Sequence, residues 1–119
     1  MLPFLLLYLL PLFSIIHNAP VQWLSQQDYE FTEVVQNEPV TCFFRFKNHS
    51  DVPILIDNVR TTCGCTAPDW SVEPIEPQGV SEIKVVYDAK KLGYFKKKIR
   101  VYFSNQKRAE VLTIQGIVD

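Results

Sequence analysis

The chain has 119 residues, of which 47% are apolar and 21% are charged, and its formal net charge is −1. That length fits a single domain, and the balanced composition excludes a disordered chain or a strongly acidic or basic tail. The average hides a division, because residues 1–19 hold 14 apolar residues and no charged side chain. The sequence therefore predicts an apolar leader followed by a globular domain of about 100 residues.

The leader contains an apolar run of 15 residues, Leu2–Ile16. A signal-peptide core has about 7–15 apolar residues, whereas a helix that spans a bilayer needs roughly 20. We therefore expect a signal peptide over residues 1–19, with an apolar signal helix and cleavage after Ala19. No Lys or Arg precedes the run, so an uncleaved membrane anchor is the alternative. The expected destination is the periplasm or the extracellular space, where thiols tend to oxidise.

After the leader, residues 20–27 are expected to form a short linker and residues 28–119 the folded domain. Residues 20–119 contain 13 Val, 7 Ile and 6 Thr, but only 4 Leu and 3 Ala. Since β-branched residues favour strands and Leu and Ala favour helices, this composition predicts an all-β fold.

Alternation of apolar and polar residues predicts strands over residues 29–35, 40–47, 52–59, 81–88, 94–103 and 110–118. Turn residues separate these runs, and the spacing predicts an immunoglobulin-like β-sandwich of about seven antiparallel strands. Phe43, Tyr94 and Tyr102 are expected to point away from the core. The expected interior is formed by Cys42, Phe44, Phe46, Leu55, Val59, Ile83, Val85, Ile99, Val101, Leu112 and Ile114.

The three cysteines fall into two kinds. Cys42 lies on an apolar strand face, so it is expected to pack as a small apolar residue. Cys63 and Cys65 are separated only by Gly64, which brings both thiols to one face of an extended segment. Three interpretations stay open: a small-ring disulfide with a redox role, a soft-metal site for Cu(I) or Zn(II), or a structural pair that holds a bend. A zinc site would need ligands from a second chain.

The motif Thr62–Thr66, with the segments 44–70, 74–88, 93–105 and 112–118, resembles the bacterial family called domain of unknown function 1573. The resemblance covers about residues 28–118. It implies an exported protein with an immunoglobulin-like fold related to PapD and Hydin-type domains, and it implies no activity. Thr32 and the inserted Gln78 depart from the family pattern, as do His49 and Ser50 in a turn. These departures concern turns rather than the fold.

Candidates for catalysis are few. One histidine follows the leader, His49, and it lies in an expected turn; no glycine-rich phosphate loop is present. We therefore expect no enzyme and no cofactor. Thiol–disulfide exchange by Cys63 and Cys65 is the one catalytic candidate, and Arg60, close in sequence, is a possible aid to lowering a thiol pKa.

Charge is divided along the domain. Residues 28–82 carry ten acidic and three basic residues, net −7, whereas residues 83–119 carry three acidic and nine basic residues, net +6. Lys96, Lys98 and Arg100 share one strand face. They form either a surface for an anionic partner or a solvated face that guards against edge pairing.

Trp70 follows the cysteines. It either covers the end of the sandwich or, if it is exposed beside Cys63 and Cys65, marks a partner surface.

The expected partner is another envelope or extracellular protein, or a glycan; nucleic acid is not expected, and membrane contact is expected only through an uncleaved leader. The sequence thus predicts an exported, non-catalytic module for protein interaction or envelope structure. The alternative is a thiol redox or copper-handling protein that uses Cys63 and Cys65.

Overall fold

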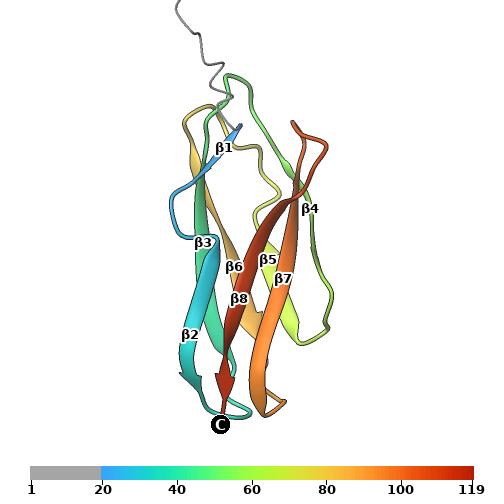
Figure 1. Ribbon diagram of the computed structural model, residues 1–119. Helices are drawn as coiled ribbons and strands as arrows, with labels where there is room; N and C mark the ends of the chain where they lie inside the picture. The colour runs from blue at the N-terminus through green and yellow to red at the C-terminus, as the bar shows by residue number, and fades with distance from the viewer. Residues whose placement is uncertain (1–19) are drawn as a thin grey trace, which may run out of the picture.

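The computed structural model describes residues 20–119, so the signal peptide and its cleavage after Ala19 lie outside the described residues. Two four-stranded sheets pack face to face (Figure 1). The strands are β1 (Val21–Trp23), β2 (Asp28–Val34), β3 (Val40–Asn48), β4 (Ile56–Thr61), β5 (Thr66–Trp70), β6 (Val80–Tyr87), β7 (Gly93–Phe103) and β8 (Glu110–Val118). Residues 20–119 include no helix that is long and apolar enough to span a membrane. The predicted all-β sandwich is confirmed.

The first sheet has the strand order β1-β3-β6-β5, and the second has β2-β8-β7-β4. Alternation places one face of each strand between the sheets. In β3 this face carries Cys42, Phe44 and Phe46, which are all buried, while Phe43 on the other face is 48% exposed. Ten of the eleven predicted interior residues are buried. Nine of them lie on strands with a strict two-residue period, whereas Val59 is buried in β4, which has a register shift between Ile56 and Asn58.

Leu55 is the exception, and its predicted place in the core is wrong. Its side chain is 38% exposed, whereas Ile54 and Ile56 on either side are buried. Residue 54 forms backbone hydrogen bonds with Ile75 in both directions, while the backbone N–H of Leu55 donates to the hydroxyl of Ser104, just after β7. The backbone therefore changes partner here, from Ile75 in the segment between β5 and β6 to β7, and the predicted strand 52–59 becomes an isolated bridge followed by β4.

The segment at the start of the domain belongs to both sheets. β1 pairs antiparallel with β3, although residues 20–27 were expected to be a linker. The chain then changes sheet, and β2 pairs parallel with β8. The sandwich is therefore not purely antiparallel, and it has eight strands rather than about seven. β1 and β5 went unpredicted because β1 has three residues and β5 contains Pro68 and Asp69, which are rare in central strands.

The parallel pairing of β2 with β8 requires a glycine at residue 116. The register of β2 shifts between Glu30 and Glu33, and the bulged backbone passes close over β8. A Cβ atom at Gly116 would lie 2.5 Å from the carbonyl oxygen of Phe31 and 2.9 Å from the ring of Phe95. No side chain fits that space without moving the backbone of β2.

We therefore predict that Gly116→Ala lowers the free energy of unfolding by about 1–3 kcal/mol, the usual cost of overpacking a buried site. The matched control is Gly64→Ala, since a Cβ atom at Gly64 meets nothing within 4 Å. Urea unfolding of both variants measures the difference. Equal stability of the two variants would contradict the close approach of β2 to Gly116.

Candidate functional site

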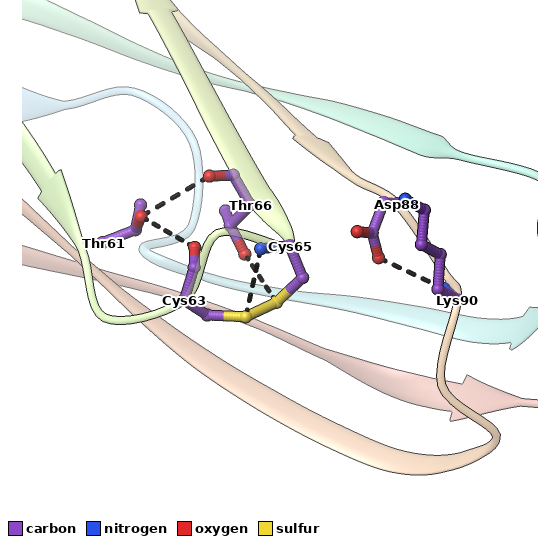
Figure 2. The surroundings of a disulfide bond; sticks show 6 residues. All are labelled: Thr61, Cys63, Cys65, Thr66, Asp88 and Lys90. Atoms are coloured by element: carbon purple, nitrogen blue, oxygen red, sulfur yellow. Dashed lines mark hydrogen bonds between the residues drawn. A yellow bond between two sulfur atoms is a disulfide. The ribbon is translucent and has the colours of Figure 1, made fainter.

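Cys63 and Cys65 form a disulfide in the turn between β4 and β5 (Figure 2). Both residues are half-buried, and Gly64 between them is exposed. The structure thus agrees with the interpretations in which the two sulfurs are bonded. In residues 20–119 no three His, Cys, Asp or Glu side chains gather as a metal-binding group, so a four-coordinate zinc site at the two cysteines would need further ligands from a second chain.

Hydrogen bonds hold the turn around the disulfide. The hydroxyl of Thr61 donates to the carbonyl oxygens of Cys63 (3.1 Å) and Thr66 (3.4 Å), as Figure 2 shows. The backbone N–H of Asp88, at the end of β6, donates to the carbonyl oxygen of Cys65 (2.9 Å). The turn is therefore fixed from β4, from β5 and from the loop after β6.

Each sulfur atom of the disulfide has one hydrogen-bond partner, and the longer contact joins Cys65 Sγ to the Thr66 hydroxyl at 3.8 Å. The backbone N–H of Cys65 donates to the Sγ of Cys63 at 3.2 Å (Figure 2). Hydrogen bonds to the charged form of a group favour that form, so this contact would stabilise a Cys63 thiolate after reduction. Arg60 gives no such help, because its guanidinium lies over the ring of Tyr102, 5.6 Å from the ring centroid.

Cys42 is a free thiol with no access to solvent. Its side chain is 3% exposed and belongs to the core, and burial raises its pKa to about 12. The thiolate is the nucleophilic form of cysteine, so Cys42 is inert at neutral pH. The prediction that it packs as a small apolar residue is confirmed.

The basic residues of β7 lie together on the outer face of the second sheet. Lys96 and Lys98 are exposed, and Arg100 is half-buried. On the neighbouring strand β4, Arg60 stands directly opposite Arg100. We call these four residues the basic row. Sequence patterns did not identify Arg60, because its place beside Arg100 depends on the pairing register of two strands far apart in the chain.

The immediate neighbours of the basic row are neutral or aromatic, and the acidic residues Asp28 and Glu30 lie one strand further away, on β2. The β8 residues opposite its three β7 members are Gln115, Thr113 and Val111. Tyr94 and Tyr102 lie on the same β7 face, beyond the two ends of the Lys96–Arg100 stretch. The Tyr94 hydroxyl donates to Oε1 of Gln115 at 3.0 Å, which fixes its ring on this surface.

Trp70 does not lie beside the disulfide. It is paired with Ile83, whereas Thr66, next to Cys65, is paired with Tyr87. Four residues of strand therefore separate them, about 13 Å at 3.3 Å per residue. Trp70 is half-buried and packs against the core. The structure thus favours a covering role for Trp70 over a surface shared with Cys63 and Cys65. The turn residue His49 is exposed.

We predict that the oxidised protein has no thiol that reacts with iodoacetamide at about pH 8, because its one free cysteine is buried and protonated. After denaturation one thiol reacts, and after denaturation with reduction all three react. Intact mass spectrometry counts the alkylated cysteines. Two thiols that react in the native, unreduced protein would contradict the Cys63–Cys65 disulfide.

Comparison with solved structures identifies the fold. The ASH or PapD-like domain of human CEP192 has a TM-score of 0.71 at 10% identity, covering 84% of this chain and 85% of that one. A protein of unknown function from Porphyromonas gingivalis has a TM-score of 0.70 at 12% identity, covering 82% and 46%. The VesB protease of Vibrio cholerae has a TM-score of 0.68 at 11% identity, covering 85% and 32%.

At these identities the likeness concerns the fold alone, and this chain spans less than half of the second and third proteins. No curated protein matches the sequence. A family model described as protein of unknown function (DUF1573) matches residues 23–118. That match covers nearly all of the described residues, including the disulfide turn and the basic row. The chain is a member of the DUF1573 family, with a PapD-like, immunoglobulin-like fold.

Proposed function

We propose that this protein is an exported, non-catalytic module that binds an anionic partner through the basic row of its second sheet. The partner is an envelope or extracellular molecule that carries carboxylate, sulfate or phosphate groups along an extended chain. The observation that carries the proposal is the direct pairing of Arg60 with Arg100. Like charges placed opposite each other on adjacent strands destabilise a sheet, and a bound anion removes that cost.

The basic row also has a regular spacing. Lys96, Lys98 and Arg100 occupy every second position of one strand, so their Cα atoms are about 7 Å apart, and Arg60 extends the row sideways onto β4. The cross-strand partners of this row on β8 are neutral. An extended polyanion can therefore approach several cations at once.

The tyrosines at the two ends favour a ligand with flat, partly apolar surfaces between its charges. Tyr94 is 65% exposed, and Tyr102 is half-buried beneath the guanidinium of Arg60. Aromatic side chains with a hydroxyl combine apolar contact with hydrogen bonding, which suits recognition surfaces. The partner is either an acidic protein or an anionic glycan, and these rings favour the glycan.

Export and the lack of catalysis rest on separate observations. The apolar leader precedes a domain with a disulfide, and disulfides persist mainly in oxidising compartments. In residues 20–119 the one histidine, His49, is exposed in a turn, away from the disulfide and from the basic row. A nucleophile activated by a neighbouring base is therefore not part of the proposed function.

The test replaces three members of the basic row, Lys96→Gln, Lys98→Gln and Arg100→Gln, in one variant. Exposed charge contacts contribute about 0.3–1 kcal/mol each, so affinity for heparin at low salt is expected to fall about 5- to 150-fold. The control variant, Lys84→Gln, Lys107→Gln and Arg108→Gln, changes the net charge equally at exposed sites elsewhere.

Poly-glutamate in a parallel titration distinguishes an acidic protein from a sulfated glycan. Preference for heparin over poly-glutamate supports a glycan partner, and the reverse preference supports an acidic protein. Equal loss of binding in the two triple variants would refute a specific role for the basic row, because only net charge would then matter.

The second candidate function is thiol–disulfide exchange, and the specific observation in its favour is the N–H of Cys65 directed at the sulfur of Cys63. A dithiol partner would transfer two electrons and two protons, break the Cys63–Cys65 bond and itself become a disulfide. The Cys63 sulfur is the better leaving group, because the amide stabilises its thiolate. Copper binding by the reduced pair is the related possibility.

Equilibration with a glutathione buffer, and titration of the reduced protein with Cu(I), test this candidate. A reduction potential above about −300 mV or stoichiometric Cu(I) uptake supports it, whereas a lower potential without Cu(I) uptake indicates a structural bond.

A structural bond closes a very small ring, so Cys63→Ser with Cys65→Ser is expected to cost only about 1–2 kcal/mol of unfolding free energy. Urea unfolding measures that cost.

A further inference from the structure

The edge of β3 is only partly covered. β1 pairs with β3 from Phe46 to Asn48, and the next contact is at Arg45, whose N–H donates to the hydroxyl of Ser25 (3.0 Å) and whose carbonyl accepts from the N–H of Leu24 (2.8 Å). Beyond this point the chain leaves for the other sheet. The first half of β3 therefore has no neighbouring strand on this side among residues 20–119.

The direction of the backbone groups identifies which ones are free. Along β3, the N–H and C=O groups of successive residues point alternately to its two neighbours. Asn48 bonds toward β6, through Gly79 and Gln78, and Arg45 bonds toward β1. Thr41 and Phe43 lie an even number of positions from Arg45 along β3, so their backbone N–H and C=O groups point to the same, uncovered side. These four groups form an open template for another strand.

The other sheet edges carry features that oppose strand addition. β5 contains Pro68 and Asp69, and the ladders of β4 and β2 are both interrupted by register shifts. β1 has only three residues. Proline, bulges, charges and short length are the usual protections of edge strands. Thr41 and Phe43 have none of them, and Phe43 presents a half-exposed aromatic ring.

A crevice of about 540 Å³ lies along this uncovered edge. Its charged lining is acidic, with Asp28 and Glu30 of β2, and it contains no Lys or Arg. Phe43 lies between this crevice and a second hollow of about 410 Å³ on the outer face of the first sheet. A strand added here would direct one set of alternate side chains outward beside Phe43 and the other set into the crevice. The carboxylates of Asp28 and Glu30 lie at the outer rim of the crevice, on the outer face of β2 beside Gln115, so only a long basic side chain reaches them.

We propose that the open edge of β3 binds a short extended segment of a partner protein by strand addition, with Lys or Arg alternating with aromatic or β-branched residues. The added strand runs antiparallel to β3, in line with β1, and bonds to Thr41 and Phe43. Charge selects a foreign segment over a second copy of this chain, because pairing two β3 edges would bring the acidic crevices of both copies together. The crevice shares Gln115 with the surroundings of the basic row but contains none of its four cations, so this proposal does not rest on the proposed function.

The test uses the blocked peptide Val-Lys-Phe-Lys-Val-Lys-Val, followed by NMR titration of the purified protein. Saturable shifts at the amides of Thr41 and Phe43 are expected, together with at least tenfold weaker binding when Glu replaces every Lys. In an antiparallel pair, hydrogen-bonded residues have side chains on the same face, so N-methylation at the apolar positions should abolish binding. N-methylation at the Lys positions should leave it within about twofold. Equal effects of the two methylation patterns would overturn the proposal.

Protein variants locate the site independently. Phe43→Ala, and Asp28→Asn with Glu30→Gln, are each expected to weaken binding of the peptide at least fivefold. Matched controls are Leu92→Ala at another exposed apolar residue, and Glu73→Gln with Glu76→Gln at exposed acids elsewhere. Unchanged binding in both test variants would overturn the proposal. So would a concentration-dependent dimer that the peptide dissociates, because the edge would then hold a second copy. The basic-row triple variant should bind the peptide normally.

Discussion

The change of sheet between β1 and β2 is the constraint on which the rest of the structure depends. One short segment pairs with β3 and then, after four residues, with β8 on the opposite layer. It thereby joins the two sheets along one side of the core. This change of sheet is possible because Gly116 lets the bulged backbone at Phe31 approach β8 closely. Its consequence in the first sheet is that the first half of β3 is paired with β6 but has no paired strand on its other side, since β1 ends at Trp23.

The three surface features occupy different parts of this frame. The disulfide is in the turn from β4 to β5, the basic row is on the outer face of the second sheet, and the open β3 edge is where the N-terminal segment changes sheet. The basic row and the open β3 edge are both held in position by strands of the core. The two binding surfaces also have opposite charge, because acidic residues of β2 line the crevice while basic residues lie on β7 and β4. The division of charge along the sequence thus becomes a division in space.

Sequence patterns predicted the strands with strict alternation, β3, β6, β7 and β8, nearly to their ends, because a two-residue period is a local property. They also predicted the exposed Phe43 and the buried Cys42. They misplaced Leu55, because the change of partner at residues 54–56 depends on Ile75 and Ser104, which are distant in the sequence. The parallel pairing of β2 and the position of Arg60 opposite Arg100 both depend on non-local register. No single-strand pattern contains that information.

Residue identities in the disulfide turn pointed to the right pair of sulfurs without deciding their use. The structure adds the hydrogen bond from the amide of Cys65 to the Sγ of Cys63 and the fixation of the turn through Thr61 and Asp88. A small disulfide ring on a hydrogen-bonded turn is sufficient to hold that turn in place. The amide of Cys65 would also favour the Cys63 thiolate on reduction, so the same geometry suits a structural bond and thiol–disulfide exchange.

Amide hydrogen exchange of the free protein tests the open edge most directly. The backbone N–H groups of Cys42 and Phe44 face β6, whereas those of Thr41 and Phe43 face the uncovered side, as the bonds of Asn48 and Arg45 indicate. The amides of Thr41 and Phe43 should therefore exchange about 100-fold or more faster than those of Cys42 and Phe44, since exposed edge groups exchange without unfolding. Equal protection of all four amides in the monomer would contradict the free edge and, with it, the exchange of sheets that creates it.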